Sequence, residues 1–448
     1  MKKNKRLIAC LCIASMLLSG VSVSAANESD SSVEQAAEDI QTDQIQRPET
    51  DQGTSEDGTD TAEAASGNET TDDTVTSEEE SVVTENPDTP ENATGEREVV
   101  SVDEKGNVFI VDDENDGVIH DEIETYARTP SVKVVNFRAN QAGNAVSGVT
   151  TYTEYGTGAS GYVYGKSGAD AAYLGEENGK VKFMQSGVVG LVDKSKVQVV
   201  NLSSVRTYSN YYADGTSILH RICMNMSISG YGGTTNIGPQ QSYMKTGTTY
   251  YSYDGHYFYT DYETMIADYK RNTRKNSVNP NNPYYNYYQY LPLRGLSSYS
   301  ANELNNIINQ HASKASKMYN KGSQFVSNQN TYGVNALLMT GVGALESAWG
   351  TSSISQQKNN LFGLNAVDSS PGTSADRFSS VDICIKDFAE TYMSKRYLRA
   401  GWDFYHGGFL GNKASGMNVS YASDAYWGEK IASLAWTMDS EGGKKDRN

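Results

Sequence analysis

The sequence predicts a multidomain chain: an acidic N-terminal tail, then two small β modules, then a mainly helical C-terminal domain. Three observations lead to this prediction. After an acidic tail and a transition zone over 97–131, the sequence changes near residue 132 to short β-branched and aromatic runs. Short hydrophobic runs separated by glycine then continue to about residue 290, as in small β domains. From residue 291 the apolar residues recur at helical spacing.

Residues 1–26 have the features of a secretory signal peptide. Basic residues within 2–6 precede an apolar run over 7–23, and Val23-Ser24-Ala25 fits the small-x-small cleavage rule. We therefore expect a secreted protein. No other stretch approaches the roughly 18 apolar residues of a membrane span, so we expect no membrane association in the mature form.

The tail holds nearly all of the negative charge. The chain has a formal net charge of −18, and residues 27–96 contain 22 Asp and Glu against the single basic residue Arg47. Such a composition buries too little apolar surface to fold, which predicts an acidic disordered linker over 27–131. Within that range the run Val108-Phe109-Ile110-Val111 resembles part of a hairpin, and its structure stays open. Nothing basic or patterned indicates nucleic-acid binding.

Residues 132–200 have the pattern of a small β-barrel. Glycines separate β-branched and aromatic runs at 161–165, 181–184, 188–192 and 197–200. The motifs Asp170-Ala171-Ala172-Tyr173-Leu174-Gly175 and Ser186-Gly187-Val188-Val189-Gly190 resemble those of bacterial SH3-like domains. This resemblance implies an accessory module that binds wall peptides or glycans.

Residues 201–290 form a second, Tyr-rich β module. Thirteen tyrosines lie between Tyr243 and Tyr290. Their rings could stack on sugars, or they could simply occupy the half-buried positions that Tyr favours in strands. The turn-rich segment 279–283 ends this module.

From residue 291 the sequence predicts four helices. Ser300-Ala301-Asn302-Glu303 has the pattern of a capping box, and a second helix carries the apolar residues of 334–348. A third runs over 381–398, and Ser423 is expected to cap the fourth. Residues 291–448 are long enough to enclose one core.

Glu346 is the strongest candidate for a catalytic group. By helical spacing it lies at the edge of the apolar stripe, next to Val342 and Trp349, and Gly350 provides a stop for the helix. A carboxyl group there is partly desolvated, which is expected to raise its pKa and suit it as a general acid for glycosidic cleavage. The alternative is a solvated Glu near a helix end.

Other hydrolytic chemistries fit the sequence poorly. The five His residues have no zinc-binding spacing, so we expect neither a metal nor another cofactor. Cys384 lies in a helical pattern, which disfavours a Cys-peptidase nucleophile. For Cys223 and Cys384 the sequence leaves open both a disulfide and two buried thiols.

Three motifs of the last domain occur in a fixed order. Glu346-Ser347-x-Trp349-Gly350-Thr351-Ser352 is followed by Gln356-Gln357-Lys358-Asn359-Asn360-Leu361-Phe362-Gly363-Leu364, and then by residues 411–432 with Tyr421-Ala422-Ser423-Asp424-x-Tyr426-Trp427-Gly428. Their order and spacing resemble the glucosaminidase domains of glycoside hydrolase family 73. They are most similar to the cell-separation endo-β-N-acetylglucosaminidases of Gram-positive cocci. The resemblance covers about 132–448 and is strongest over 334–436.

The resemblance implies a lysozyme-like (α+β) catalytic domain over 291–448. It would cleave the β-1,4 bond between N-acetylglucosamine and N-acetylmuramic acid. Glu346 matches the catalytic acid of the family, and Tyr421 matches a tyrosine that assists the reaction centre. Six residues of these motifs are expected to contact substrate: Trp349, Asn360, Phe362, Gly363, Tyr426 and Trp427.

The second catalytic carboxylate is harder to place. Asp368 and Asp376 are the only acids of the short lobe that follows the second motif, and Asp368 is the preferred candidate. It could instead serve a turn before Pro371. Without a second carboxylate, the substrate's acetamido group would be the nucleophile, oriented by Tyr421. Asp424 is expected to complement a helix dipole.

The expected protein is a secreted, cell-wall-associated monomer that acts on peptidoglycan glycan strands and their stem peptides. Its role would be wall remodelling or daughter-cell separation. One rival is a lytic transglycosylase of the same fold. Another is a non-catalytic wall-binding adhesin in which the β modules carry the function. The modular organisation predicts that residues 291–448 alone retain activity on soluble glycan fragments.

Overall fold

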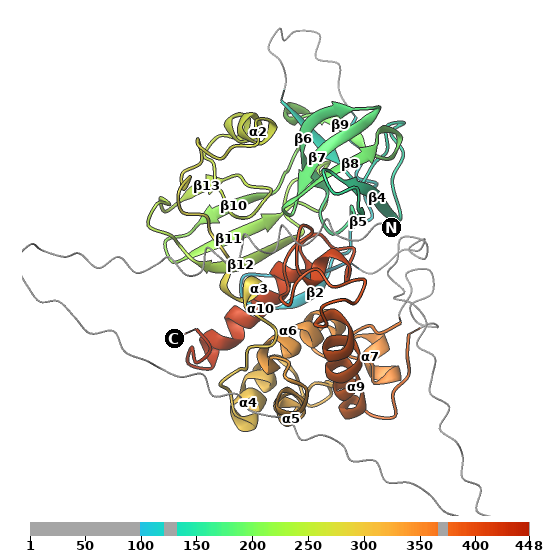
Figure 1. Ribbon diagram of the computed structural model, residues 1–448, viewed down its shortest axis with the longest axis vertical. Helices are drawn as coiled ribbons and strands as arrows, with labels where there is room; N and C mark the ends of the chain where they lie inside the picture. Colours follow the sequence, from blue (N-terminus) through green and yellow to red (C-terminus); the bar gives the residue numbers. More distant parts are fainter. Residues whose placement is uncertain (1–98, 121–131, 366–374, 448) are drawn as a thin grey trace, which may run out of the picture. The chain divides into compact units, whose positions relative to one another are not determined.

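The computed structural model describes residues 99–120, 132–365 and 375–447, which belong to one compact unit of mixed sheets and helices (Figure 1). The predicted signal peptide and most of the predicted linker lie outside these residues, as does Asp368. Among the described residues, no helix is both long enough and apolar enough to cross a membrane.

A hairpin opens the described chain, formed by β1 (Val100–Val102) and β2 (Val108–Ile110). The strands are antiparallel, with Val102 opposite Val108. The predicted linker is therefore wrong for this stretch. Val102 is fully buried in the core of the helical domain, so apolar packing holds the hairpin in place. The acidic residues around it in the sequence led to the prediction of a disordered linker.

The first β module is a seven-stranded antiparallel sheet in the order β5-β4-β8-β7-β6-β3-β9. Its strands are β3 (Lys133–Asn136), β4 (Val149–Glu154), β5 (Ser160–Tyr164), β6 (Asp170–Glu177), β7 (Lys180–Gln185), β8 (Val188–Asp193) and β9 (Gln198–Asn201). Short 3₁₀ turns follow at η1 (Lys194–Lys196) and η2 (Leu202–Ser204). The four predicted runs correspond to β5, β7, β8 and β9. The SH3-like assignment stays a prediction.

The second module has a four-stranded sheet in the order β12-β11-β10-β13, followed by helices α2 and α3. The elements are β10 (Asn210–Ala213), β11 (Ser217–Ile222), β12 (Gly233–Pro239), β13 (Thr248–Tyr250), α2 (Tyr262–Lys270) and α3 (Tyr287–Tyr290). Seven of the thirteen tyrosines are buried: Tyr250, Tyr253, Tyr259, Tyr262, Tyr269, Tyr284 and Tyr288. Most of this tyrosine cluster is therefore core, and only Tyr285 and Tyr287 are well exposed.

The helical domain contains α4 (Ala301–His311), α5 (Gly322–Tyr332), α6 (Ala336–Ser347), α7 (Ser353–Lys358), α9 (Val381–Asp387), η3 (Phe388–Tyr397), η4 (Met417–Val419) and α10 (Trp427–Glu441). The capping box of Ser300 and Glu303 is confirmed. The predicted third helix is α9 continued by the π-helix η3. The predicted cap at Ser423 is wrong, because the Ser423 carbonyl accepts from Tyr164 N of β5 (2.9 Å) and α10 begins at Trp427.

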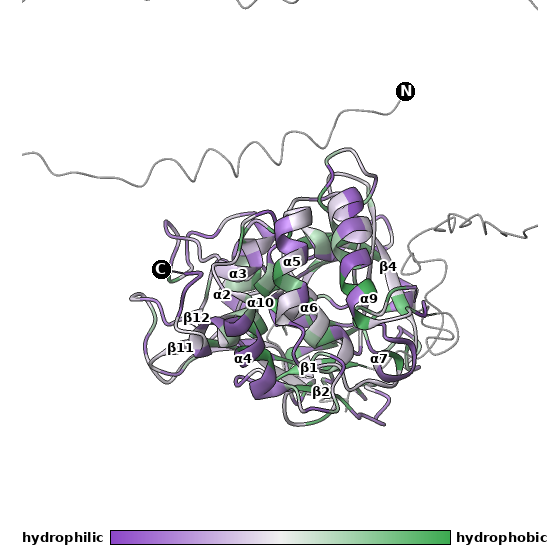
Figure 2. Cartoon of the chain, turned by 90° about the horizontal axis from the view of Figure 1, so that it is seen from below, coloured by the Kyte–Doolittle hydropathy of each residue, from purple (hydrophilic) through white to green (hydrophobic). Residues whose placement is uncertain are grey.

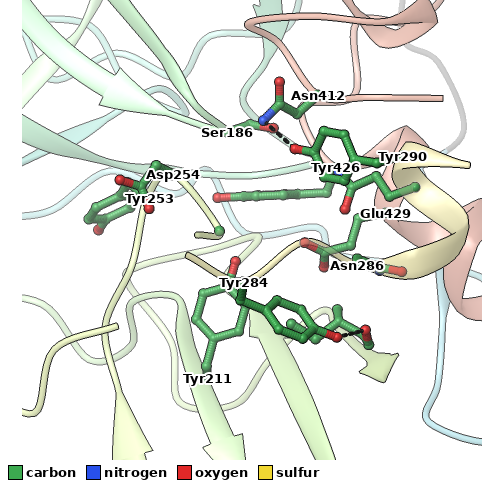
Figure 3. Close-up of a pocket in the computed structure, with 13 residues that line it drawn as sticks. Ser186, Tyr211, Tyr253, Asp254, Tyr284, Asn286, Tyr290, Asn412, Tyr426 and Glu429 are labelled. Carbon is green, nitrogen blue, oxygen red and sulfur yellow. Dashed lines mark hydrogen bonds between the residues drawn. The ribbon is translucent and has the colours of Figure 1, made fainter. Parts of the chain in front are cut away.

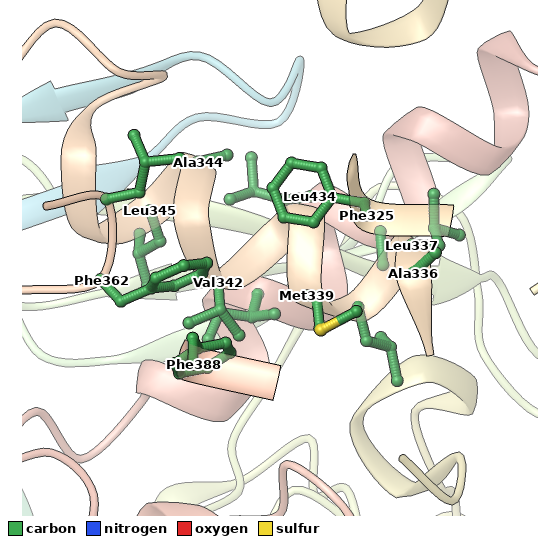
Figure 4. Close-up of a cluster of buried hydrophobic side chains, with 14 of the residues drawn as sticks. Phe325, Ala336, Leu337, Met339, Val342, Ala344, Leu345, Phe362, Phe388 and Leu434 are labelled. Atoms are coloured by element: carbon green, nitrogen blue, oxygen red, sulfur yellow. The ribbon is translucent and has the colours of Figure 1, made fainter. Parts of the chain in front are cut away.

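Helix α6 is the centre of the domain. Every residue from Ala336 to Ser347 is buried except Glu346, so α6 is enclosed on nearly all sides, not only along one stripe. It packs against α10, where a methyl group added to Gly341 would lie 3.1 Å from Ile431 Cγ2. The ring of Phe362 stacks on that of Phe388 at 3.8 Å in the same core (Figure 4).

The two described cysteines, Cys223 and Cys384, are free and buried. The open question is thus settled in favour of two thiols. Burial raises the pKa of Cys384 to about 12, and that of Cys223 well above its usual value. Neither is therefore suited to be a nucleophile at neutral pH.

Helix α10 joins the helical domain to the sheets. It contacts α6 and α3 as well as β12 and β1. Hydrophilic and hydrophobic residues alternate around the helices of this region (Figure 2). Two ionisable residues of α10, Glu429 and Lys430, are buried at these contacts, so the boundary between the modules is a packed interface.

Candidate active site

The end of α6 fixes the position of Glu346. Ala348 and Trp349 both adopt left-handed backbone conformations, with φ of 47° and 55°, and Gly350 follows at φ 76°. Two consecutive non-glycine residues in this region are strained, which is typical of functional sites. Hydrogen bonds hold the turn, including Trp349 N to Ala344 O (2.8 Å) and Gly350 N to Ser347 Oγ (2.8 Å).

The Glu346 side chain is half-buried and lines a pocket of about 410 Å³. Its Oε1 accepts a hydrogen bond from Trp427 Nε1 at 2.7 Å. Its Oε2 lies beside Gly363, where an added methyl group would approach to 3.5 Å. The lining of the pocket is formed by Val100, Ser167, Leu345, Glu346, Ala422, Ser423, Asp424 and Trp427. The Glu346 carboxyl group thus faces the pocket, while the backbone of Glu346 is fixed by the buried helix α6.

Asn360 shapes the loop that brings Gly363 to Glu346. Its Oδ1 accepts from Phe362 N (3.3 Å) and Leu364 N (3.0 Å), and its Nδ2 donates to Leu364 O (2.9 Å). Gly363 adopts φ 63°, a conformation that disfavours any side chain. Asn360 and Phe362 are themselves buried, so the structure gives them a supporting place in the loop.

Tyr421 packs on the same site from the other side. Its ring lies 4.6 Å from that of Trp427 and 5.2 Å from that of Tyr397. Its hydroxyl donates to Phe362 O at 3.4 Å. The structure therefore brings together Glu346, Gly363, Tyr421 and Trp427 of the predicted site residues.

Asp424 is a site residue that the sequence did not identify. It lines the Glu346 pocket, and its Oδ2 lies 2.6 Å from Lys430 Nζ. Lys430 is fully buried and also donates to Val100 O at 3.0 Å. The only signal in the sequence was its place in the motif, between aromatic residues; the pairing with Lys430, six residues away, does not follow a helical spacing.

Two predicted substrate residues lie elsewhere. Trp349 does not line the pocket: its ring stacks on His311 at 4.4 Å, and its Nε1 donates to Gly106 O at 3.3 Å. Tyr426 is buried with the core residues of the first β module, edge-on to His220 at 4.9 Å. Neither ring is available at the Glu346 pocket.

Tyr426 lines a second, narrow pocket, where residues of the second β module converge on α10 (Figure 3). Glu429 faces this cavity and accepts from Thr235 Oγ1 (2.6 Å) and pairs with His220 Nδ1 (2.7 Å). Asn412 Nδ2 donates to Tyr290 OH at 3.1 Å. These polar groups mainly bind one another, and the cavity belongs to the interface between modules.

No group of three His, Cys, Asp or Glu residues that could hold a metal ion occurs in the described parts of the chain. The pocket instead combines two carboxylates with hydroxyls, a tryptophan and apolar side chains. Such a lining can bind a neutral, hydroxylated ligand and transfer a proton to it.

The chain is similar to known proteins over part of its length. Two proteins of Streptococcus pneumoniae, from strains TIGR4 and R6, are each 33% identical to the chain over 265 residues, and both are provisionally named endo-beta-N-acetylglucosaminidase. The matches cover 58% of this chain but only 34% and 32% of the relatives. The chain thus spans about a third of the length of these curated relatives.

A solved structure, a catalytic mutant of Staphylococcus aureus autolysin E in complex with a NAG-NAM disaccharide, is 22% identical to the chain. It matches over 35% of this chain and 73% of its own length with a TM-score of 0.29, which is too low to support a conclusion.

The family comparison is specific to the helical domain. The model for the family described as Glucosaminidase, mannosyl-glycoprotein endo-beta-N-acetylglucosaminidase, matches residues 322–440. This range extends from α5 into α10 and contains Glu346, the Gly363 loop, Tyr421 and Trp427. Within residues 322–440, the chain therefore contains a region that matches the glucosaminidase family.

Proposed function

We propose that the chain is an endo-β-N-acetylglucosaminidase that cleaves the β-1,4 bond between N-acetylglucosamine and N-acetylmuramic acid in peptidoglycan. The main support is the position of Glu346, the one residue of α6 that is not buried, whose carboxyl group lines a pocket in a glucosaminidase domain. A glycosidic bond needs a proton on its leaving oxygen, and Glu346 is the general acid.

The geometry assigns different tasks to the two carboxyl oxygens. Because Oε1 accepts from Trp427 Nε1, the catalytic proton is carried on Oε2, beside Gly363. At Gly363 no side chain occupies the space beside Oε2, where an added Cβ would lie at 3.5 Å, in van der Waals contact. Trp427 therefore orients the acid, and Gly363 admits the leaving oxygen.

The second step requires either a carboxylate that activates water or the substrate's own acetamido group. Tyr421 is placed to orient that acetamido group, because its ring packs on Trp427 next to Glu346. Asp424 shares the pocket, but its ion pair with Lys430 suits it to positioning. Asp368 lies outside the described residues and remains a candidate water-activating base.

The wider biological role follows from this proposal. The signal-peptide pattern of residues 1–26 indicates a secreted enzyme associated with the cell wall. It acts as a monomer on glycan strands that carry stem peptides, in wall remodelling or daughter-cell separation. The first β module is an SH3-like accessory that holds the enzyme on the wall.

Glu346→Gln is the principal test. The amide is nearly isosteric but cannot donate the proton, so activity should fall about 10²- to 10⁴-fold while thermal unfolding stays unchanged. Digested sacculi are reduced with borohydride, and the new ends are identified by mass spectrometry. Glu263→Gln, an exposed substitution on α2, is the matched control.

Reduced glucosamine ends from the wild-type protein support the proposal. Reduced muramic acid ends contradict it, and anhydro muramic ends indicate the transglycosylase. A Glu346→Gln variant that keeps more than about a tenth of wild-type turnover contradicts the role of Glu346.

The nucleophile is tested by comparing Tyr421→Phe with Asp368→Asn. The acetamido route predicts that Tyr421→Phe is the more damaging change and that Asp368→Asn causes a modest loss. If Asp368 activates water, Asp368→Asn should lose activity as severely as Glu346→Gln does, roughly 10²-fold or more. Turnover on the same soluble glycan fragments measures both variants.

A further inference from the structure

The hairpin of β1 and β2 reaches the Glu346 pocket from outside the glucosaminidase domain. It lies more than 200 residues before the matched range 322–440 in the sequence. Nevertheless Val100 is one of the residues that line the pocket with Glu346. A segment that the family model does not include therefore forms part of the wall of the site.

Three contacts fix the hairpin in this place. Val102 is fully buried in the core around α6, and Lys430 Nζ donates to Val100 O at 3.0 Å. At the tip, Gly106 O accepts from Trp349 Nε1. Together these three contacts hold the hairpin against the helical domain.

The hairpin has two distinct faces. Val100 and Ile110 are directly opposite, and Val111 N donates to Val99 O one position away, so the Val100–Ile110 pair is a non-hydrogen-bonded pair with closely spaced side chains. Ile110 thus lies on the same face of the hairpin as Val100, which lines the pocket, and Ile110 is 50% exposed. Phe109 lies on the opposite face of the same strand and is 40% exposed.

We propose that the hairpin is one wall of a glycan subsite and that the Ile110 side chain contacts an acetamido methyl group of the bound glycan. This inference rests on the proposed function. A methyl group is the main apolar part of an N-acetylated sugar, and an exposed aliphatic side chain continuous with the pocket lining is suited to cover it. Ser167 and Ser423, also in the lining, offer hydroxyls to the polar part of the same sugar.

Ile110→Thr in the full chain tests the subsite. Threonine keeps the β-branched shape but loses apolar contact area, so KM for soluble peptidoglycan fragments should rise roughly three- to ten-fold with kcat nearly unchanged. Phe109→Thr is the matched control, because it makes a similar change on the other face, and its KM should equal that of the wild type. Ile110→Leu, which retains apolar surface, should restore KM to near the wild-type value.

Thermal unfolding of each variant separates binding from folding. Equal changes of KM in Ile110→Thr and Phe109→Thr, or no change in Ile110→Thr, would overturn the inference. The inference would also be overturned if both Ile110→Thr and Ile110→Leu raised KM and lowered the melting temperature, because the loss would then come from folding and not from binding. Failure of the proposed function is distinguishable, because the wild-type chain would then release no reducing glucosamine ends.

Discussion

Tyr426 and Trp427 are neighbours in the sequence, but their side chains serve different parts of the molecule. The Trp427 indole donates to Glu346, whereas Tyr426 is buried in the core of the first β module and packs on His220 of the second. On one side of the segment, Trp427 contributes to the site. On the other side, Tyr426 packs against residues of the two β modules. The difference shows that the site is not independent of the β modules.

Further contacts of the same segment support this conclusion. Ser423 O accepts from Tyr164 N (2.9 Å), and Ala425 O accepts from Ser186 Oγ (2.6 Å). These bonds tie the backbone on either side of Asp424 to the first sheet. The position of Asp424 in the Glu346 pocket therefore depends on residues of another module.

The largest expected effect is that of removing the modules. Residues 291–448 alone would lose Val102 from their core and expose the buried Glu429 and Lys430 of α10. We now expect this fragment to lack cooperative unfolding and to be inactive even on soluble glycan fragments, in contrast to the expectation from sequence. Melting curves followed by circular dichroism and turnover on soluble glycan fragments are measured for residues 291–448, with residues 99–448 as the control. A fragment that melts and turns over like the control would restore the modular organisation.

A single buried His–Glu hydrogen bond tests the same interface less drastically. Glu429 pairs with His220 across it, and both side chains are almost fully buried. Glu429→Ala leaves His220 and Thr235 without their shared acceptor, and a buried donor left unsatisfied typically costs about 1–3 kcal/mol of stability. Denaturant unfolding measures the free-energy change.

The control is a second His–Glu pair on the same helix. Glu441 lies 2.8 Å from His311, but this pair is more exposed. Glu441→Ala should cost only about 0–1 kcal/mol. Equal losses in the two variants would mean that the interface pair has no special importance.

The features that the sequence could predict are those that depend on local spacing. Glu346 and the Gly363 loop depend on residues close together in the chain, and so do the capping box and the strands of the first sheet. Trp349 was misplaced because helical spacing sets it beside Glu346, whereas the helix ends at Ser347 and two left-handed residues turn the ring toward Gly106. That partner is 243 residues away in the sequence. The hairpin, Asp424 and the buried Tyr426 likewise depend on long-range packing, which periodicity does not reveal.

The smallest expected effects separate the two faces of the segment directly. Trp427→Phe keeps a ring beside Tyr421 but removes the N–H that donates to Glu346. One such hydrogen bond is worth about 0.5–1.5 kcal/mol, so turnover should fall roughly two- to tenfold. Tyr426→Phe removes only a buried hydroxyl, which should lower thermal stability slightly and leave turnover within about twofold. Turnover on soluble fragments and melting temperature are measured for both variants. If Tyr426→Phe lost activity with unchanged stability while Trp427→Phe did not, the assignment of the two faces would be reversed, and Tyr426 would regain the substrate role that the sequence predicted.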